Sequence, residues 1–368
     1  MSPAGAAGGS RLERARAILD ELEADVLLAS RPALRRWLAG FVLERGDETT
    51  SGYSGTLLIS RDAQLVMVDA RYLEQAQAEC LGWDVRLTTE PLETELFALA
   101  AELGVGRLAA EAQVLSHADW AAITESGLLL LAADEPLREL RLRKDADEVA
   151  AIQRACALTD ACFEHLLAFA KPGVSERDIA WELEGWFRQH GAEDLAFEPL
   201  VLVGARAAMP HGRTANTRVA RDQPLLVDFG CQVDGYRSDM TRTVFFGEPD
   251  AETRRRYEAV RQAQQLAFEA AAPGVIGKAV DQVARDHLQE AGLGEAFSHG
   301  LGHGIGLETH EDPLLLGWTR PLEAGMVVTL EPGVYLPGEI GIRIEDDVHL
   351  TPAGAVRLTN APRELLVL

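Results

Sequence analysis

The chain has 368 residues, 47% of them hydrophobic and 25% charged, which is enough for two globular domains. Its net charge of −23 argues against nucleic acid or anionic lipid as partners, because those bind clustered Lys and Arg. No apolar run is long enough to span a membrane, no signal peptide is recognisable, and the four cysteines fit no disulfide framework. We therefore expect a cytoplasmic protein without a membrane partner.

The first part of the chain alternates helix-like and strand-like segments. Residues 1–10 predict a flexible tail, and helical spacing begins at 11–24. A charged, proline-containing stretch at 134–147 indicates a domain boundary. We therefore expect an N-terminal α/β domain over 11–140 and a second domain over 143–368.

The second domain contains a weak internal repeat. Residues 145–187 and 250–288 share one layout, a helix, a Pro-Gly-Val turn and another helix, and each copy precedes strand-rich sequence. Ser175 and Asp178 predict a capping box for the second helix of the first copy. Two αβ halves that face each other would form one site between them.

Four carboxylates stand beside or within apolar strands of this domain. Asp228 ends the run "LLVDFG", and a hairpin after it would bring Asp239 close. Glu331 ends another apolar strand, and Glu345 is expected inside a further one. Buried glutamates need a partner or a metal, and Arg343 can pair with only one of them.

The segment "SHGLGHGIGLETHEDP" at 298–313 adds histidines among glycines. Its alternating glycines do not form a dinucleotide motif, and it lacks the second histidine of an H-E-x-x-H zinc site. Converging carboxylates repel one another unless cations compensate, and four carboxylates with one imidazole suit two divalent ions. Such an oxygen-rich set favours Mn²⁺, with Co²⁺ and Zn²⁺ as alternatives. Two ions about 3.5–4 Å apart can generate a bridging hydroxide and polarise a carbonyl.

These motifs resemble the pita-bread metallopeptidases, and most closely the proline-specific branch, Xaa-Pro dipeptidase (prolidase) and aminopeptidase P. The resemblance covers essentially the whole chain and implies a creatinase-like N-terminal domain before a pita-bread catalytic domain with pseudo-twofold αβ halves. Five residues match the family's metal ligands in chain order: Asp228, Asp239, His303, Glu331 and Glu345.

The resemblance also implies a role for each ligand. Asp228 would bind one metal, Asp239 and Glu345 would bridge both, and His303 with Glu331 would complete the other site. Glu331 would also act as general base toward the bridging water.

Four further residues receive roles from the resemblance. His211 matches a histidine that binds substrate and stabilises the oxyanion, and His310 one that lies near the scissile carbonyl and leaving nitrogen. His299 is expected to support its loop by hydrogen bonding. Arg343 is expected to brace the carboxylates and to contact substrate.

An apparent insertion at Glu44–Ser51 is the one departure that bears on specificity. We expect Arg45, in that loop, to lean over an active site, its own or the partner subunit's, and to bind the free carboxylate of a dipeptide. This loop alone favours Xaa-Pro dipeptidase over aminopeptidase P, which releases the first residue of longer Xaa-Pro peptides.

The residues make several alternative functions less favourable and leave other questions open. A non-enzymatic binding protein on this fold would be expected to have lost ligands, creatinase works without metal, and methionine aminopeptidases usually lack so large an upstream domain. The family suggests a homodimer. The sequence leaves open the native metal, the preferred residue before proline and the physiological substrate.

Overall fold

The protein is described here by a computed structural model, which covers residues 10–43 and 53–368. The chain divides into two compact units, Met1–Arg141 and Leu142–Leu368. The predicted loop at Glu44–Ser51, with Arg45, lies outside the described residues, as does all of the predicted tail except Ser10.

The first unit alternates helices with strands. Its helices are α1 (Arg11–Glu21), α2 (Pro32–Ala39), α3 (Leu73–Glu79), α4 (Leu92–Leu103), α5 (His117–Glu125) and α6 (Asp134–Leu142). Its strands are β1 (Val26–Ala29), β2 (Thr56–Ser60), β3 (Gln64–Val68), β4 (Asp84–Leu87), β5 (Arg107–Ala110) and β6 (Leu129–Ala132).

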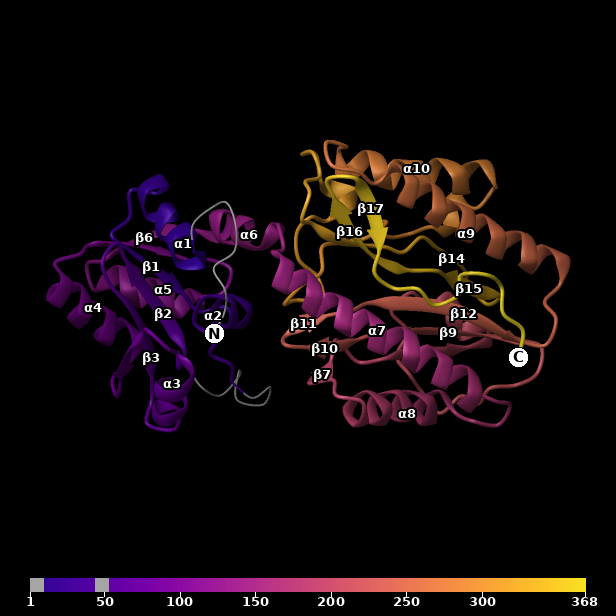
Figure 1. Ribbon diagram of the computed structural model, residues 1–368, viewed down its shortest axis with the longest axis horizontal. Helices are drawn as coiled ribbons and strands as arrows, with labels where there is room; N and C mark the ends of the chain where they lie inside the picture. The colour runs from indigo at the N-terminus through magenta and orange to yellow at the C-terminus, as the bar shows by residue number, and fades with distance from the viewer. Residues whose placement is uncertain (1–9, 44–52) are drawn as a thin grey trace. The chain divides into compact units, whose positions relative to one another are not determined.

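These strands form one mixed sheet in the order β4-β3-β2-β1-β5-β6. Because side chains alternate along a strand, Leu27 and Ala29 of β1 face one core with α1, α2, α3 and α6. Val26 and Leu28 face the opposite core with α4 and α5. The unit is a three-layer α/β/α domain (Figure 1).

The second unit holds four long helices and eleven strands among its described residues. The helices are α7 (Ala146–Phe169), α8 (Glu176–Gln189), α9 (Ala251–Ala270) and α10 (Gly277–Glu290), with short 3-10 turns η1 (Gly204–Ala208), η2 (Gly294–Ala296) and η3 (Leu315–Gly317). The strands of its first half are β7 (Asp194–Leu195), β8 (Leu200–Val203), β9 (Gln223–Phe229), β10 (Cys231–Val233), β11 (Tyr236–Arg237) and β12 (Met240–Phe246). The strands of its second half are β13 (Val327–Leu330), β14 (Gly333–Leu336), β15 (Ile340–Arg343), β16 (Asp346–Thr351) and β17 (Gly354–Arg357).

The two halves of this unit have the same plan, a helix pair followed by strands. Helices α7 and α8 pack on β8, β9 and β12, and helices α9 and α10 pack on β13 to β16. Figure 1 shows α10 above the strands and α8 below them, with α7 crossing in front. The pseudo-twofold arrangement of αβ halves expected from the repeat is therefore confirmed.

Local signals position the helices. The predicted capping box is present, with the Ser175 side chain accepting from the amide of Asp178 and the Asp178 carboxylate accepting from the amide of Ser175. The helices within residues 10–43 and 53–368 are each too short or too polar to span a membrane.

Candidate metal centre

The first two carboxylates lie on adjacent strands. Strand β9 pairs antiparallel with β12, so that Asp228 faces Thr241 and Asp239 comes directly before the paired segment. Gly230 allows the two arms of the hairpin to approach, because a Cβ there would lie 1.9 Å from the carbonyl oxygen of Ser238. The predicted hairpin that brings Asp228 and Asp239 together is confirmed.

The two glutamates come from the second half. Glu331 follows β13 directly, at the end of an apolar strand as predicted. The prediction that Glu345 lies inside a strand is wrong, because it stands in the joint between β15 and β16. The chain changes sheets at this joint, since β15 pairs with β14 and β16 with β13. The Glu345 amide instead donates to the carbonyl oxygen of Thr241, 3.1 Å away, which links the two halves.

His303 is fixed by main-chain contacts to the neighbouring strand β13. Its amide donates to Thr329 Oγ1 at 3.1 Å, and the Thr329 amide donates to the His303 carbonyl oxygen at 2.8 Å. A Cβ on Gly302 would lie 2.0 Å from the Thr329 carbonyl oxygen. One of the glycines in this segment is therefore needed so that the histidine loop can approach the strand.

The side chains of these residues converge. Ligand atoms of Asp239, His303 and Glu345, all buried, lie within 4.8 Å of one another. His303 Nε2 is 3.5 Å from Glu331 Oε1 and 3.8 Å from Asp239 Oδ2. Asp228 joins the group through Arg343, whose Nη2 donates to Asp228 Oδ2 at 2.5 Å and whose Nε lies 4.0 Å from Glu331 Oε2.

This crowding shifts the ionisation of the cluster. Burial, followed by repulsion from neighbouring carboxylates, raises the pKa of Asp239 and of Glu345 well above their ordinary values. Burial also raises the pKa of Glu331 to about 8. Burial, then the nearby His310, lowers the pKa of His303 to about 4. Without a cation, Asp239, Glu331 and Glu345 therefore hold protons more readily than usual, and the His303 imidazole is neutral near pH 7.

A hard or borderline divalent cation fits this donor set. Across the described part of the chain, no hydrogen-bond donor reaches Oδ1 of Asp228 or Oδ1 of Asp239, although both atoms are buried. Oxygen atoms with free lone pairs beside a neutral imidazole nitrogen are the ligands that Mn²⁺, Co²⁺ and Zn²⁺ share. A bound cation would also remove the repulsion that raises the pKa values of the carboxylates.

The cluster lines a cavity of about 600 Å³. The side chains of His211 and His310 are exposed within its lining, whereas His299 is half-buried there. His299 Nδ1 lies 2.8 Å from the Gly300 carbonyl oxygen and Nε2 lies 2.9 Å from the Tyr335 hydroxyl. These contacts are those expected of a residue that supports its loop.

The rest of the cavity wall is largely apolar. Besides the ionisable groups, its lining contains Phe197, Leu200, Pro210, Leu314 and Leu316. The cavity thus places an apolar surface next to a cluster of ionisable side chains, an arrangement that suits a small organic substrate.

Arg343 is buried and pairs mainly with Asp228, rather than with one of the glutamates as the sequence suggested. Its Nε donates to Thr241 Oγ1 at 2.9 Å and its Nη1 to the Tyr335 hydroxyl at 2.8 Å. Thr241 in turn donates to Glu345 Oε2 at 2.7 Å. These bonds orient two carboxylates at once.

Thr241 and Tyr335 were not identified from the sequence. The strand period of two could have found Thr241, because it lies two residues after Asp239 and shares its face. Tyr335 had no comparable signal, since its role depends on pairing between β14 and β15, where Gly333 faces Arg343.

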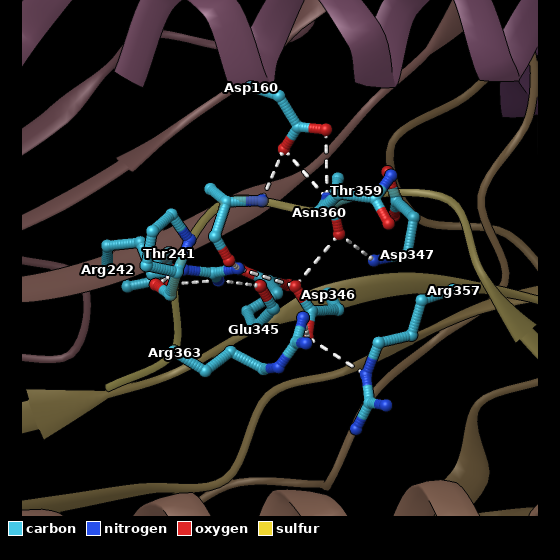
Figure 2. A network of polar contacts seen from close by, with 12 residues as sticks. Asp160, Thr241, Arg242, Glu345, Asp346, Asp347, Arg357, Thr359, Asn360 and Arg363 are labelled. Atoms are coloured by element: carbon cyan, nitrogen blue, oxygen red, sulfur yellow. Dashed lines mark hydrogen bonds and ion pairs between the residues drawn. The ribbon is translucent and has the colours of Figure 1, made fainter. Parts of the chain in front are cut away.

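A second buried network ties Glu345 to the end of the chain (Figure 2). Arg242 Nη1 donates to the Glu345 carbonyl oxygen at 2.5 Å, and its Nη2 donates to Asp346 Oδ1 at 2.7 Å and to the Ala361 carbonyl oxygen at 2.8 Å. Arg357 and Arg363 also approach Asp346, at 3.5 and 3.3 Å. Three guanidinium groups around one carboxylate thus fix the backbone that carries Glu345.

Comparison with known proteins agrees with this fold. Residues 150–352 match metallopeptidase family M24, and residues 11–143 match the Creatinase/Prolidase N-terminal domain. The uncharacterized peptidase YqhT of Bacillus subtilis is 34% identical over 361 residues, 97% of this chain and 100% of that protein.

Two solved structures are similar over almost the full length. An Xaa-Pro dipeptidase from Bacillus anthracis is 35% identical, with a TM-score of 0.91 over 97% of this chain and 99% of that one. An X-Pro aminopeptidase from Thermotoga maritima MSB8 is 34% identical, with a TM-score of 0.89 over the same shares. The chain belongs to metallopeptidase family M24, with a creatinase-like N-terminal domain and a pita-bread catalytic domain, as the sequence predicted. It is a metal-dependent peptidase of the proline-specific branch.

Proposed function

We propose that this protein is an Xaa-Pro dipeptidase, which hydrolyses the bond between the first residue and proline. The observation that carries the proposal is the convergence of buried carboxylates and a neutral imidazole on a cavity with an apolar wall. The similarity to the Bacillus anthracis dipeptidase over nearly the whole chain supports the same activity.

The proposed ligands of two divalent ions are the five converging residues, Asp228, Asp239, His303, Glu331 and Glu345. Their distances and the unused carboxylate oxygens support this assignment. We propose Mn²⁺ as the native metal because oxygen donors dominate the set. The ions would supply an activated water and would polarise the scissile carbonyl.

Glu331 is the proposed general base. Its carboxylate lies next to the ligand atoms, with Oε1 3.5 Å from His303 Nε2, so it can accept a proton from an attacking water. Proton delivery matters more than usual in this reaction. The proline nitrogen is a tertiary amide without N–H, and it must be protonated as it leaves. Glu331 can carry the proton from one side of the reaction to the other.

His211 and His310 are the proposed substrate-binding residues. Burial, then repulsion from His211, lowers the pKa of His310, so its ring is neutral near pH 7 and its N–H can donate to a carbonyl oxygen. Arg343 holds Asp228 and also lines the cavity, so a contact from its guanidinium to substrate stays a prediction.

The setting of the enzyme is also proposed. A cytoplasmic location agrees with the absence of a membrane-spanning helix in the described ranges, and the family resemblance favours a homodimer. We also propose that Arg45, which lies outside the described residues, binds the carboxylate of the dipeptide.

Aminopeptidase P activity is the second candidate. It is favoured by the similarity to the Thermotoga maritima aminopeptidase and by the exposed apolar rim, where Leu314 is 52% and Leu316 47% exposed. A rim of this kind can accept a residue beyond proline as readily as a side chain before it.

The deciding experiment uses protein stripped with chelator and reloaded with Mn²⁺. Hydrolysis of Leu-Pro is timed beside that of Leu-Pro-Gly-Gly. Cleavage restricted to the dipeptide supports the proposal, and preferential cleavage of the longer peptide favours the aminopeptidase. Cleavage of neither by metal-loaded protein would refute both and would point to a binding protein.

A further inference from the structure

Within the described part of the chain, the His310 ring lacks a hydrogen bond that would fix its direction. It is exposed in the cavity, and none of the described residues forms a hydrogen bond with it. Its centroid lies 4.3 Å from that of His303. The direction of the imidazole therefore depends on how the main chain on either side of it is held.

The residue before His310 is fixed by the first half of the catalytic domain. Thr309 is buried, and its hydroxyl donates to the Ala196 carbonyl oxygen at 3.1 Å and accepts from Arg237 Nη1 at 2.9 Å. This side of the loop is thus fixed by neutral and charged hydrogen bonds together.

The residue after His310 is held by a buried ion pair. Lys144 Nζ lies 2.6 Å from Glu311 Oε1, and the two side chains are only 1% and 7% exposed. The Lys144 amide is itself fixed, since it donates to the Gly325 carbonyl oxygen at 2.8 Å. Glu311 and Gly304 also exchange main-chain hydrogen bonds of 3.0 and 2.9 Å.

Gly306 leaves the space that the ion pair occupies. A Cβ on Gly306 would lie 2.4 Å from Glu311 Oε1 and 3.0 Å from Lys144 Cε. Burying two charges costs about as much as their attraction returns, so a well-packed apolar pair would serve stability at least as well. What the charged pair adds is a defined direction, because a carboxylate at a fixed ammonium cannot rotate freely.

We propose that Lys144 is a positioning residue, which acts through Glu311 to hold the His310 imidazole in the orientation that the reaction needs. This inference rests on the proposed Xaa-Pro peptidase activity and on the role of His310 in it. Lys144 does not touch the cavity, so it contributes no group to catalysis itself.

The test compares Lys144→Met with Arg143→Met. Arg143 is the neighbouring residue, and its ion pair with Glu323 is exposed, with side chains 58% and 47% accessible, so the control removes one charge without disturbing the loop. Lys144→Met should lower kcat/KM for Leu-Pro by about tenfold or more at unchanged Mn²⁺ content, because loss of a residue that orients a catalytic group typically has an effect of that size. Arg143→Met should stay within about twofold of wild type. Equal activity of the two variants would overturn the proposal.

A double-mutant cycle separates positioning from general damage. In a His310→Ala background, Lys144→Met should cost nothing further, because the ring that it orients is gone. An additive loss would mean that Lys144 acts elsewhere and would overturn the inference. If Lys144→Met fails to fold, the double variant Lys144→Met with Glu311→Met removes both charges and enters the same cycle.

A second measurement does not depend on activity. The His310 imidazole NMR signal, identified by its loss in His310→Ala, should move in the Lys144 variant and stay in place in Arg143→Met. An unmoved signal would overturn the positioning role. Inactivity of wild type toward Xaa-Pro substrates would instead refute the proposed function, and the NMR comparison would still decide the inference.

Discussion

Removing the metal should make the catalytic domain less stable as the pH rises, and Glu331 should account for a definable share of the loss. Burial raises the pKa of Glu331 from its ordinary 4.5 to about 8 in the metal-free protein. The folded state then holds a proton that the unfolded state has released. The contribution of Glu331 to stability is therefore greatest below its pKa in the unfolded chain. It falls as the pH rises toward its pKa in the folded protein.

The histidines do not contribute between pH 6.5 and pH 8, whereas Asp239 and Glu345, whose pKa values are also raised, add a slope of the same sign in wild type and variant. Burial lowers the pKa values of His299 and His303 from 6.5 to about 4, so these groups change stability in the opposite direction, but only below pH 6.5. Above it, one extra proton in the folded state costs about 1.4 kcal/mol per pH unit, so Glu331 should remove about 2 kcal/mol across the window.

The assay is chemical unfolding of chelator-treated wild type and Glu331→Gln across this window. The wild-type free energy of unfolding should fall more steeply with pH than that of Glu331→Gln. The difference in slope should correspond to about one bound proton. Saturating Mn²⁺ should reverse the trend in wild type, because metal binding displaces the protons and strengthens with pH. Equal slopes for the two metal-free proteins would refute the pKa assignment and the crowding on which it depends.

Three substitutions test other parts of the site. Thr241→Val should weaken Mn²⁺ binding and cost about 1–3 kcal/mol of stability, because it leaves Glu345 Oε2 without its donor; unchanged metal affinity by calorimetry would contradict this. Gly230→Ala should lower the melting temperature and the Mn²⁺ content together, since its Cβ would lie 1.9 Å from the Ser238 carbonyl oxygen, and native-like values for both would speak against the hairpin geometry. Leu316→Asp should raise KM for Leu-Pro by about tenfold without changing Mn²⁺ content, while an unaltered KM would remove the apolar wall from substrate binding.

The fold could be predicted from the sequence because the signals for its helices and turns are local and occur twice. The helix pairs at 145–187 and 250–288 each combine helical spacing with a turn, and both form helices at those places. The site residues could be predicted for a related reason. Carboxylates among apolar strand residues are unusual, so their apolar neighbours single them out in the sequence.

What escaped the sequence depends on contacts between distant segments. Glu345 was expected within a strand because its neighbours are apolar on both sides, yet the chain changes partner strands at that point. Tyr335, which bonds His299 and Arg343, could not be found because no short-range pattern encodes a hydrogen bond between side chains of different segments. Lys144 was assigned to a charged boundary segment, where charge normally indicates solvent exposure, although its side chain is buried.

The link between Arg242 and the residues near the C-terminus has a consequence for biosynthesis. Two proposed ligands come from the first half of the catalytic domain and three from the second, and the backbone at Glu345 is held by a guanidinium that also bonds the Ala361 carbonyl oxygen. A ribosome must therefore release nearly the whole chain before the proposed ligand set can close around an ion. Metal capture is then a late event in maturation, and a prematurely terminated chain has no complete site with which to withdraw metal from the cell.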